Sequence, residues 1–286
     1  MDITEISLKK TQIMSHLIPG KSETYIYETE IEYYKEYQIS FFALTREKAG
    51  WDCLRHYEII ANGCIPYFPT INACPSNTLY CFPKKWIEQG NCLYNRISQF
   101  ENVYTISPLW RNEYIKLLET FQHYMKLYLT TDKMAQNILN RSNNYVTNML
   151  FLSGCSQPDY LRCLTLHGFK VLFGEKCHDY PRISHLYKTI ENLDYLYGKG
   201  MTYTNLLSRE MHNDEKDLTI EKDILSKKYD IIVYGNIHRG MPFFEQVLKS
   251  YLPNEIILLC GEDIHQCREG ETYSNQGYCV FCRELN

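Results

Sequence analysis

The chain has 286 residues, of which 44% are hydrophobic and 22% are charged, so it is long enough for two globular domains with buried cores. Its net charge of −4 excludes a general nucleic-acid binder, which needs a basic surface to displace counterions from phosphates. No stretch approaches the roughly 20 apolar residues of a membrane helix, and the first residues lack the apolar core of a secretion signal. We therefore expect a cytoplasmic protein without a membrane segment.

The twelve cysteines are too few for a disulfide scaffold, and in a reducing compartment we expect free thiols. The closest pair is Cys279 and Cys282, separated by two residues. Cys260 and Cys267 lie upstream at a spacing that matches neither a zinc ribbon nor a zinc finger. The spacing therefore favours buried or idle thiols over a metal site.

The first half of the chain alternates between short apolar runs and helical patterns. Residues 37–44 (YQISFFAL) predict a buried strand, and residues 51–62 a helix that ends at Gly63. Residues 64–68 (CIPYF) follow as a short strand, in which Pro66 indicates an edge or a strand end. A stretch without Pro or Gly predicts one long helix over residues 113–140.

The second half repeats this alternation after a polar linker at residues 140–144 (NRSNN). Apolar runs predict strands and amphipathic runs predict helices, and the charged stretch 209–228 is expected to face solvent. The predicted strands are 147–153, 231–235 and 255–260, and the predicted helices are 159–168 and 242–251. Alternating strands and helices predict an α/β fold with parallel sheets in two Rossmann-like lobes, residues 1–140 and 145–286.

The most informative segment, residues 45–66, lies where a strand ends and a helix begins, which is the edge where parallel sheets bind ligands. Its loop supplies Arg46 and Lys48, and the start of a helix suits a phosphate. Arg55, Glu58 and Asn62 share one helix face. Arg55 is suited to hold a pyrophosphate and Glu58 to accept hydrogen bonds from a ribose diol. The alternative is a surface ion pair between Arg55 and Glu58.

This segment, with Cys74-Pro75 and Pro83-Lys84 after it, resembles the donor-site signature of exostosin-like glycosyltransferases. That signature has an arginine, a glutamate three residues later, and then Gly-Cys-x-Pro. It is matched by Arg55, Glu58, Gly63, Cys64 and Pro66. The resemblance implies two GT-B-like lobes facing a cleft, with Arg55 at the diphosphate and Glu58 at the ribose. The donor-binding residues expected are Thr45, Arg46, Lys48, Trp51, Asp52, Arg55, His56, Glu58 and Asn62.

The order of the lobes is swapped relative to this family. Segments similar to residues 229–263 and 278–285 come first in the relatives and last here, which indicates a circular permutation. The small size and the permuted order resemble xylosyltransferases of large algal DNA viruses. That likeness implies host cytoplasm, UDP-xylose as donor, and transfer with inversion to an oligosaccharide or glycan acceptor.

Two other functions are compatible with the same segment. One is the same fold with another donor, such as UDP-galactose, UDP-glucuronate or a GDP-sugar. The other is a nucleotide-sugar-binding protein that has lost catalysis. A dinucleotide-dependent oxidoreductase is disfavoured because no G-x-G-x-x-G opens either lobe.

Inverting transfer requires a base that takes the proton of the acceptor hydroxyl. The segments after two predicted strands offer candidates, in the order Asp263, His238 and Glu262, with a helix cap or a turn residue as the alternative role of Asp263. Asn236 and Arg239 are predicted to lie on the phosphate or acceptor side.

Two further expectations concern metals and the acceptor. The chain has no Asp-x-Asp motif, so we expect leaving-group stabilisation by arginine, lysine and helix dipoles, without a metal or an obligatory cofactor. His178, Asp179 and Arg182 form a further polar cluster, which is either an acceptor loop or plain surface.

Overall fold

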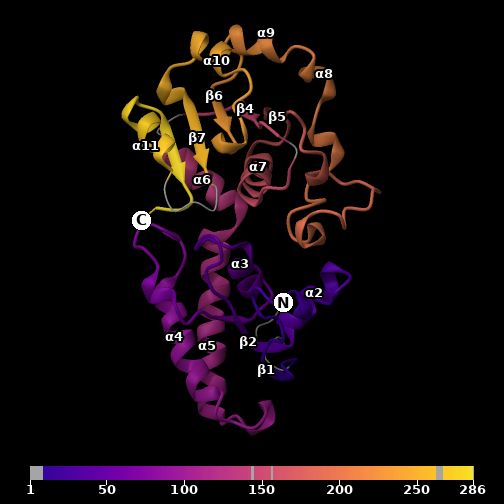
Figure 1. Cartoon of the computed structure of the whole chain (residues 1–286), viewed down its shortest axis with the longest axis vertical. Coiled ribbons are helices and arrows are strands. Elements are labelled where there is room, and N and C mark those ends of the chain that lie inside the picture. The colour runs from indigo at the N-terminus through magenta and orange to yellow at the C-terminus, as the bar shows by residue number, and fades with distance from the viewer. Residues whose placement is uncertain (1–8, 143–144, 156, 262–266, 286) are drawn as a thin grey trace. The chain divides into compact units, whose positions relative to one another are not determined.

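The computed structural model describes residues 9–142, 145–155, 157–261 and 267–285, which fall into two compact units, Met1–Leu129 and Thr130–Leu285. Each unit contains one parallel β-sheet packed with helices (Figure 1), so the predicted α/β class is confirmed. Within the described ranges, no helix is both long enough and apolar enough to cross a membrane.

The first unit is built on a three-stranded sheet of order β1-β2-β3. Strand β2 aligns Phe42 with Ile65 of β3, which is an edge strand and therefore accommodates Pro66. Its strands are β1 (Gln12–Met14), β2 (Ser40–Leu44) and β3 (Ile65–Tyr67), and its helices are α2 (Glu30–Gln38), α3 (Leu54–Ala61), α4 (Lys84–Ile97) and α5 (Pro108–Tyr124). The predicted strand at 37–44 is shorter than expected because α2, which begins in a capping box at Thr29, extends to Gln38.

The long helix predicted over residues 113–140 is divided. Helix α5 ends at Tyr124, a π-helical turn spans Met125–Leu129, and helix α6 (Thr131–Ser142) follows. A π-helical turn keeps the chain helical but changes its hydrogen-bond spacing, so the apolar pattern alone does not reveal the break. The division between the two units falls after this turn, so α6 lies in the second unit.

The second unit contains a five-stranded parallel sheet of order β5-β4-β6-β7-β8. The strands are β4 (Met149–Leu152), β5 (Cys177–Tyr180), β6 (Ile231–Tyr234), β7 (Ile256–Cys260) and β8 (Cys279–Cys282). The helices besides α6 are α7 (Tyr160–Phe173), α8 (Asp214–Asp217), α9 (Ile220–Leu225), α10 (Phe244–Ser250) and α11 (Arg268–Asn275). The predicted strands and helices of this half are confirmed, whereas β5 was not predicted.

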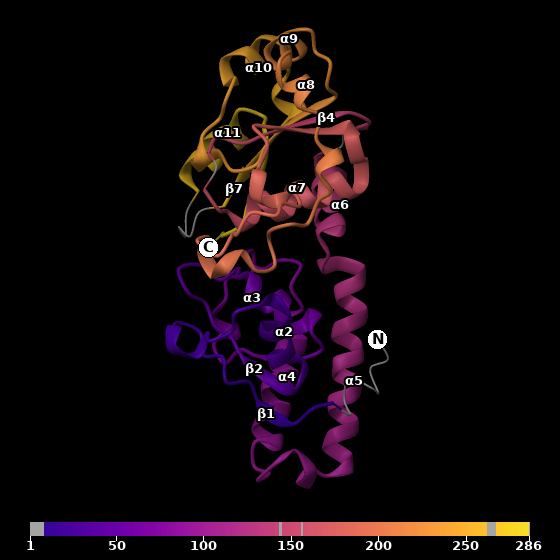
Figure 2. The same ribbon diagram turned by 90° about the vertical axis from the view of Figure 1, so that its right-hand side faces the viewer.

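Alternate residues of the central strands enter two different cores. Phe151 of β4 and Val233 of β6 pack with α6 and α7, whereas Leu150 and Ile232 pack with α9 and α10. These helical layers can be followed in Figure 2. Because side chains alternate along a strand, a sheet covered on both faces needs apolar residues at every position. This requirement explains why the apolar runs at β4, β6 and β7 were recognisable in the sequence.

The order of the strands creates a switch point between β4 and β6. From β4 the chain adds β5 on one side and then β6 on the other. In doubly wound sheets, the crevice at the carboxyl ends of such strands is the usual ligand site. A ligand site of this unit is therefore expected in the segments that follow β4, β5 and β6.

Gly168 sets the distance between α6 and α7. A Cβ atom at this position would collide with the backbone oxygen of Thr131. Gly168→Ala normally favours a helix, but here we expect a loss of about 1–3 kcal/mol of unfolding free energy because backbone must move. Urea denaturation would measure it. Val171→Ala, on the exposed side of the same helix, should change stability by no more than about 0.5 kcal/mol. Equal stability of Gly168→Ala and the wild type would contradict this close approach.

Candidate functional site

The predicted donor segment forms the connection from β2 to α3 and on to β3. Thr45, directly after β2, is fully buried, and its backbone N–H donates to the carbonyl of Tyr67. Helix α3 begins at Leu54, and Gly63 takes a φ of 68° after its last turn. A positive φ is the conformation that favours glycine at the end of a helix. The predicted strand–loop–helix–strand arrangement is therefore present, with the loop at the carboxyl end of β2.

A chain of hydrogen bonds fixes this loop. The Nε of Arg55 donates to Thr45 Oγ1 over 3.1 Å, and Thr45 Oγ1 lies 2.8 Å from Nδ1 of His56. The other ring nitrogen of His56, Nε2, lies 2.8 Å from the carbonyl oxygen of Trp51. A carbonyl only accepts, so Nε2 carries the proton and Nδ1 accepts from the hydroxyl of Thr45. Each group thus donates to the next, from Arg55 to Thr45, from Thr45 to His56 and from His56 to Trp51. This arrangement requires an unprotonated Nδ1 and therefore a neutral His56.

The pKa values agree with this assignment. Burial lowers the pKa of His56 from 6.5 to about 3. Burial would also lower the pKa of Arg55, but Tyr25 and Cys53 nearby outweigh burial and raise that pKa above its usual value. His56 therefore shapes the loop from inside the unit, and the donor contact that the resemblance implies for it stays a prediction.

Glu58 lies inside the first unit, with 8% of its surface exposed. Its carboxylate accepts a hydrogen bond of 2.6 Å from the hydroxyl of Tyr33, and its backbone carbonyl accepts from the side chain of Asn62. Burial and the charge of Glu58 raise the pKa of Tyr33 well above its usual value. Because the carboxylate of Glu58 is buried and bound to Tyr33, the alternative of a surface ion pair with Arg55 does not apply. The contact of Glu58 with a ribose stays a prediction.

The remaining donor-segment residues are more accessible. Arg46 and Lys48 are exposed, and Arg46 donates to the carbonyl of Pro19. Trp51 stacks on Phe68 with ring centroids 6.0 Å apart. Asp52 accepts a hydrogen bond from the hydroxyl of Tyr57. Arg46, Lys48 and the partly buried Arg55 thus come from one loop and one helix start, which is an arrangement suited to a phosphate.

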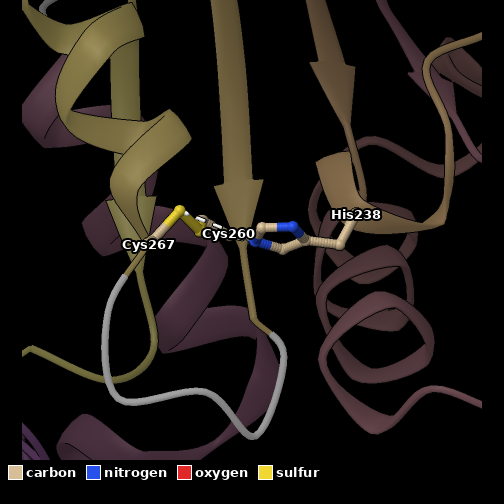
Figure 3. Close-up of side chains that lie close together, drawn as sticks. All are labelled: His238, Cys260 and Cys267. Atoms are coloured by element: carbon tan, nitrogen blue, oxygen red, sulfur yellow. Dashed lines mark hydrogen bonds between the residues drawn. A yellow bond between two sulfur atoms is a disulfide. The ribbon is translucent and has the colours of Figure 1, made fainter.

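In the second unit, the candidate base His238 lies beside a disulfide. Figure 3 shows its imidazole directed at the sulfur atoms, with Nε2 3.1 Å from Cys260 Sγ and 3.6 Å from Cys267 Sγ. Sulfur atoms in a disulfide have no proton to donate, so Nε2–H faces them and Nδ1 is the basic nitrogen. The other two candidates, Glu262 and Asp263, lie outside the described residues.

The Cys260–Cys267 disulfide corrects one expectation. Free thiols were predicted from the missing secretion signal, but β7 ends at Cys260 and Cys267 directly precedes α11, and the fold brings these two residues together. The other ten cysteines are free thiols. Cys279 and Cys282, the closest pair in the sequence, are the two ends of β8.

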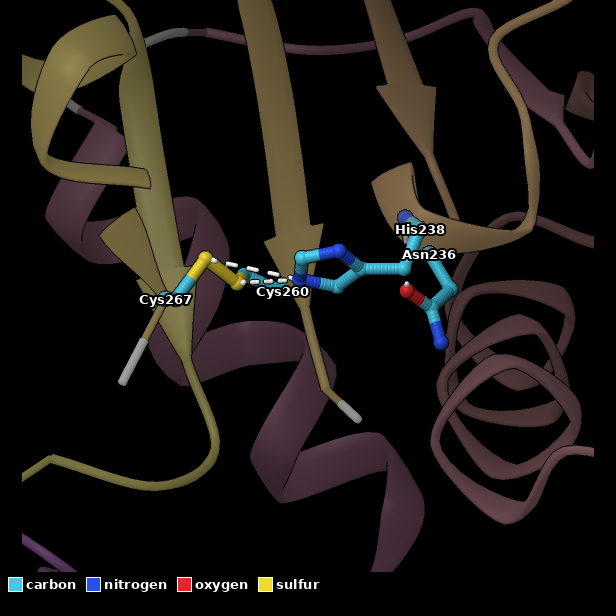
Figure 4. The surroundings of a disulfide bond; sticks show 4 residues. All are labelled: Asn236, His238, Cys260 and Cys267. Atoms are coloured by element: carbon cyan, nitrogen blue, oxygen red, sulfur yellow. Dashed lines mark hydrogen bonds between the residues drawn. A yellow bond between two sulfur atoms is a disulfide. The ribbon is translucent and has the colours of Figure 1, made fainter. Parts of the chain in front are cut away.

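Asn236 and Arg239 have different surroundings. Asn236 is buried, donates to Asp159 over 2.6 Å, and accepts from the backbone N–H of His238 (Figure 4). Asn236 is thus a structural link between the segments after β6 and β4, and its position inside the protein does not favour the predicted ligand contact. Arg239 is partly exposed and donates to Gln157.

Arg239 is one of the residues that line a pocket of about 690 Å³ at the switch point. The segments after β4, β5 and β6 all contribute to it. The described residues that line the pocket include four cations and one carboxylate, that of Glu191. The net positive charge of the pocket therefore favours an anionic ligand. The cations are Arg182, Lys188, Arg209 and Arg239, and the tyrosines are Tyr187, Tyr195 and Tyr197. Tyrosine rings offer both an apolar face and a hydroxyl, which suits a sugar.

The cluster at His178 and Asp179 is not plain surface, since these residues are 2% and 0% exposed. Oδ1 of Asp179 accepts from Nζ of Lys170 over 2.8 Å and from the hydroxyl of Tyr187 over 2.6 Å, and lies 3.0 Å from Nδ1 of His212. Burial alone would raise the pKa of Asp179, but His212 and Lys170 hold it at about 2. Part of the stretch 209–228, expected in solvent, is therefore buried.

Most of the pocket was not predicted from the sequence because β5 was not predicted. The long connection from β5 to β6, which carries no apolar run, contributes Lys188, Tyr195, Tyr197 and Arg209. The cluster of tyrosines in this connection was the available signal, because a binding loop is rich in such rings.

Comparisons of the chain with protein families, with curated proteins and with solved structures gave no match.

Proposed function

We propose that the chain is a glycosyltransferase of the exostosin-like type. It transfers a sugar, with xylose as first choice, from a UDP-sugar to an oligosaccharide or glycan acceptor with inversion. The donor binds within residues 1–140 and the acceptor within residues 145–286, in a GT-B-like arrangement of swapped order. No metal or other cofactor is needed for the transfer itself.

The position of Arg55 is the observation that carries this proposal. It lies at the start of α3, at the carboxyl end of β2, where its Nε donates to Thr45 and one Nη donates to the carbonyl of Arg46. Two fixed contacts hold the guanidinium in place before any ligand arrives. A preorganised cation stabilises the diphosphate that leaves when the glycosidic bond of the donor breaks. The exposed Arg46 and Lys48 add positive charge to the same loop.

The pocket of the second unit supports the acceptor part of the proposal. It lies at the switch point, where parallel sheets bind ligands, and it combines cations with tyrosines. Nδ1 of His238, or a carboxylate of Glu262 or Asp263, takes the proton from the acceptor hydroxyl. Arg239 lines the pocket and binds the acceptor or its phosphate.

Arg55→Ala should weaken UDP binding by roughly 10- to 100-fold, because a hydrogen bond to a charged group contributes about 1.5–3 kcal/mol. Isothermal titration calorimetry of UDP, GDP and a panel of UDP-sugars would measure the change. The control is Arg96→Ala, an exposed arginine of α4 that stacks on Trp110, which should bind UDP like the wild type. If folded wild-type protein binds none of these nucleotides, the proposal is rejected.

Turnover then separates the two alternatives. Incubation with the tightest-binding nucleotide sugar and a glycan array should release UDP and label an acceptor. Binding of UDP-galactose, UDP-glucuronate or a GDP-sugar in preference to UDP-xylose would identify another donor. Tight binding with no transfer and no release of UDP would identify an inactive nucleotide-sugar-binding protein.

A further inference from the structure

Beside the pocket, two histidines and an aspartate direct their ligand atoms at one point. Nε2 of His178, at β5, lies 2.8 Å from Oδ1 of Asp217, and Nε2 of His212 lies 3.3 Å from Oδ2 of the same carboxylate. One ligand atom from each of the three residues can be chosen so that all lie within 4.8 Å of one another. The two rings stack with centroids 4.9 Å apart. Three residues from two segments thus surround a single small volume.

The spacing of these atoms is close to that of a zinc site. Zinc binds histidine nitrogen and carboxylate oxygen at about 2.0–2.2 Å in a tetrahedron, whose ligand atoms are then about 3.3 Å apart. The distance from the carboxylate of Asp217 to His212, 3.3 Å, equals this value, and the distance to His178, 2.8 Å, is shorter. Imidazole ligands select zinc and similar transition ions over magnesium and calcium, which prefer oxygen.

A second carboxylate orients His212. Its Nδ1 lies 3.0 Å from Asp179, which is buried and also accepts from Lys170 and Tyr187. An ionised carboxylate only accepts, so Nδ1 of His212 carries a proton and Nε2 is the nitrogen left for a metal. Nε2 points at a carboxylate oxygen 3.3 Å away; in the metal-free protein a proton on Nε2 bridges this gap, and a bound cation takes the place of that proton. A carboxylate behind a histidine is the usual outer support of a metal ligand.

Charge and access also fit a divalent ion. Oδ1 of Asp214 lies 3.5 Å from Nε2 of His212 and is available as a fourth ligand, although it also pairs with Arg182. The side chains of Asp214 and Asp217 are 71% and 26% exposed, so solvent reaches one side of the site. The two carboxylates balance the two charges of a zinc ion, while Lys170 balances Asp179.

We propose that His178, His212 and Asp217 bind one Zn²⁺ ion, with Asp214 as the fourth ligand. The ion ties the segment around α8 to the end of β5 and so fixes the wall of the pocket that carries Arg209. Its role is structural, and it is independent of the donor chemistry proposed for the first unit. Among the described residues, His238 with Cys260 and Cys267 is a second group of suitable atoms, but its sulfurs form a disulfide, which offers no thiolate.

Calorimetric titration of the metal-stripped full chain with ZnCl₂ tests the proposal. We expect one equivalent to bind, and His178→Gln or Asp217→Asn to weaken binding by at least about 100-fold. Asp179→Asn, which removes the support behind His212 together with the charge that pairs with Lys170, should weaken Zn²⁺ binding by about 10- to 100-fold in the folded variant. His123→Gln, an exposed histidine of α5, is the matched control and should bind like the wild type. Circular dichroism checks that each variant is folded.

Cobalt absorption identifies the ligand atoms. With Co²⁺ in place of Zn²⁺, the site should show ligand-field bands and no sulfur-to-metal charge-transfer band, because all its ligands are nitrogen or oxygen. Three results would overturn the proposal. They are no Zn²⁺ binding by the wild type, undiminished binding by folded Asp217→Asn and His178→Gln, or a charge-transfer band that disappears in Cys267→Ser.

Discussion

Lys170→Met should lower the unfolding free energy by about 3–5 kcal/mol, which is among the largest effects expected for a single substitution. The side chains of Lys170 and Asp179 are 0% and 1% exposed, and the ammonium group lies 2.8 Å from the carboxylate. Removing the lysine leaves a carboxylate in the interior without its cation, and the cost of that buried charge exceeds the loss of the contact itself. Urea unfolding followed by far-ultraviolet circular dichroism would measure the change.

A double-mutant cycle tests whether the pair, rather than packing, causes the loss. Asp179→Asn should cost less in the Lys170→Met background than in the wild type, with a coupling of about 1–3 kcal/mol. The surface pair Lys227–Glu255, with 46% and 21% exposure, is the control, and Lys227→Met should cost less than about 1 kcal/mol. Additive effects at Lys170 and Asp179 would mean that the buried charges do not stabilise each other.

The central strands could be predicted from the sequence because burial on both faces gives them uninterrupted apolar runs. Strands β4 (MLFL), β6 (IIVY) and β7 (IILLC) are buried at every position. Strand β5 (CHDY) is nearly as buried, but its two central residues, His178 and Asp179, are polar and have partners far along the chain. Asp179 contacts His212, which is 33 residues away in the sequence, so no local sequence pattern indicates that this strand is buried. The same distance in sequence concealed the histidine–aspartate group.

The candidate donor site was predictable in its outline but not in its contacts. The spacing placed Arg55 and Glu58 correctly on α3, since a helix of 3.6 residues per turn fixes that relation, whereas Asn62 is the residue that follows its last turn. The partners of these residues depend on how the loop after β2 folds back. The hydroxyl of Tyr33, which comes from α2, meets Glu58, and periodicity could not identify it because α2 itself was not predicted.

Mild acid should destabilise the first unit, and His56 should account for most of the effect. The pKa of His56 is lowered from 6.5 to about 3, so between these values the unfolded chain binds a proton that the folded protein does not. His56 therefore leaves stability unaffected above pH 6.5 and reduces it as pH falls toward about 3, by about 1.4 kcal/mol per pH unit. At about pH 4 the loss relative to neutral pH should reach about 3 kcal/mol.

Tryptophan fluorescence reports this effect selectively, because all three tryptophans, Trp51, Trp86 and Trp110, belong to the first unit. Urea midpoints measured between neutral pH and about pH 4 should fall steeply for the wild type and for the exposed-histidine variant His123→Gln. In His56→Gln the same midpoints should change much less with pH, even if the variant is less stable throughout, because the glutamine has no proton to gain. A pH dependence identical to the wild type would show that His56 is not the buried neutral imidazole on which the loop from Thr45 to Arg55 depends.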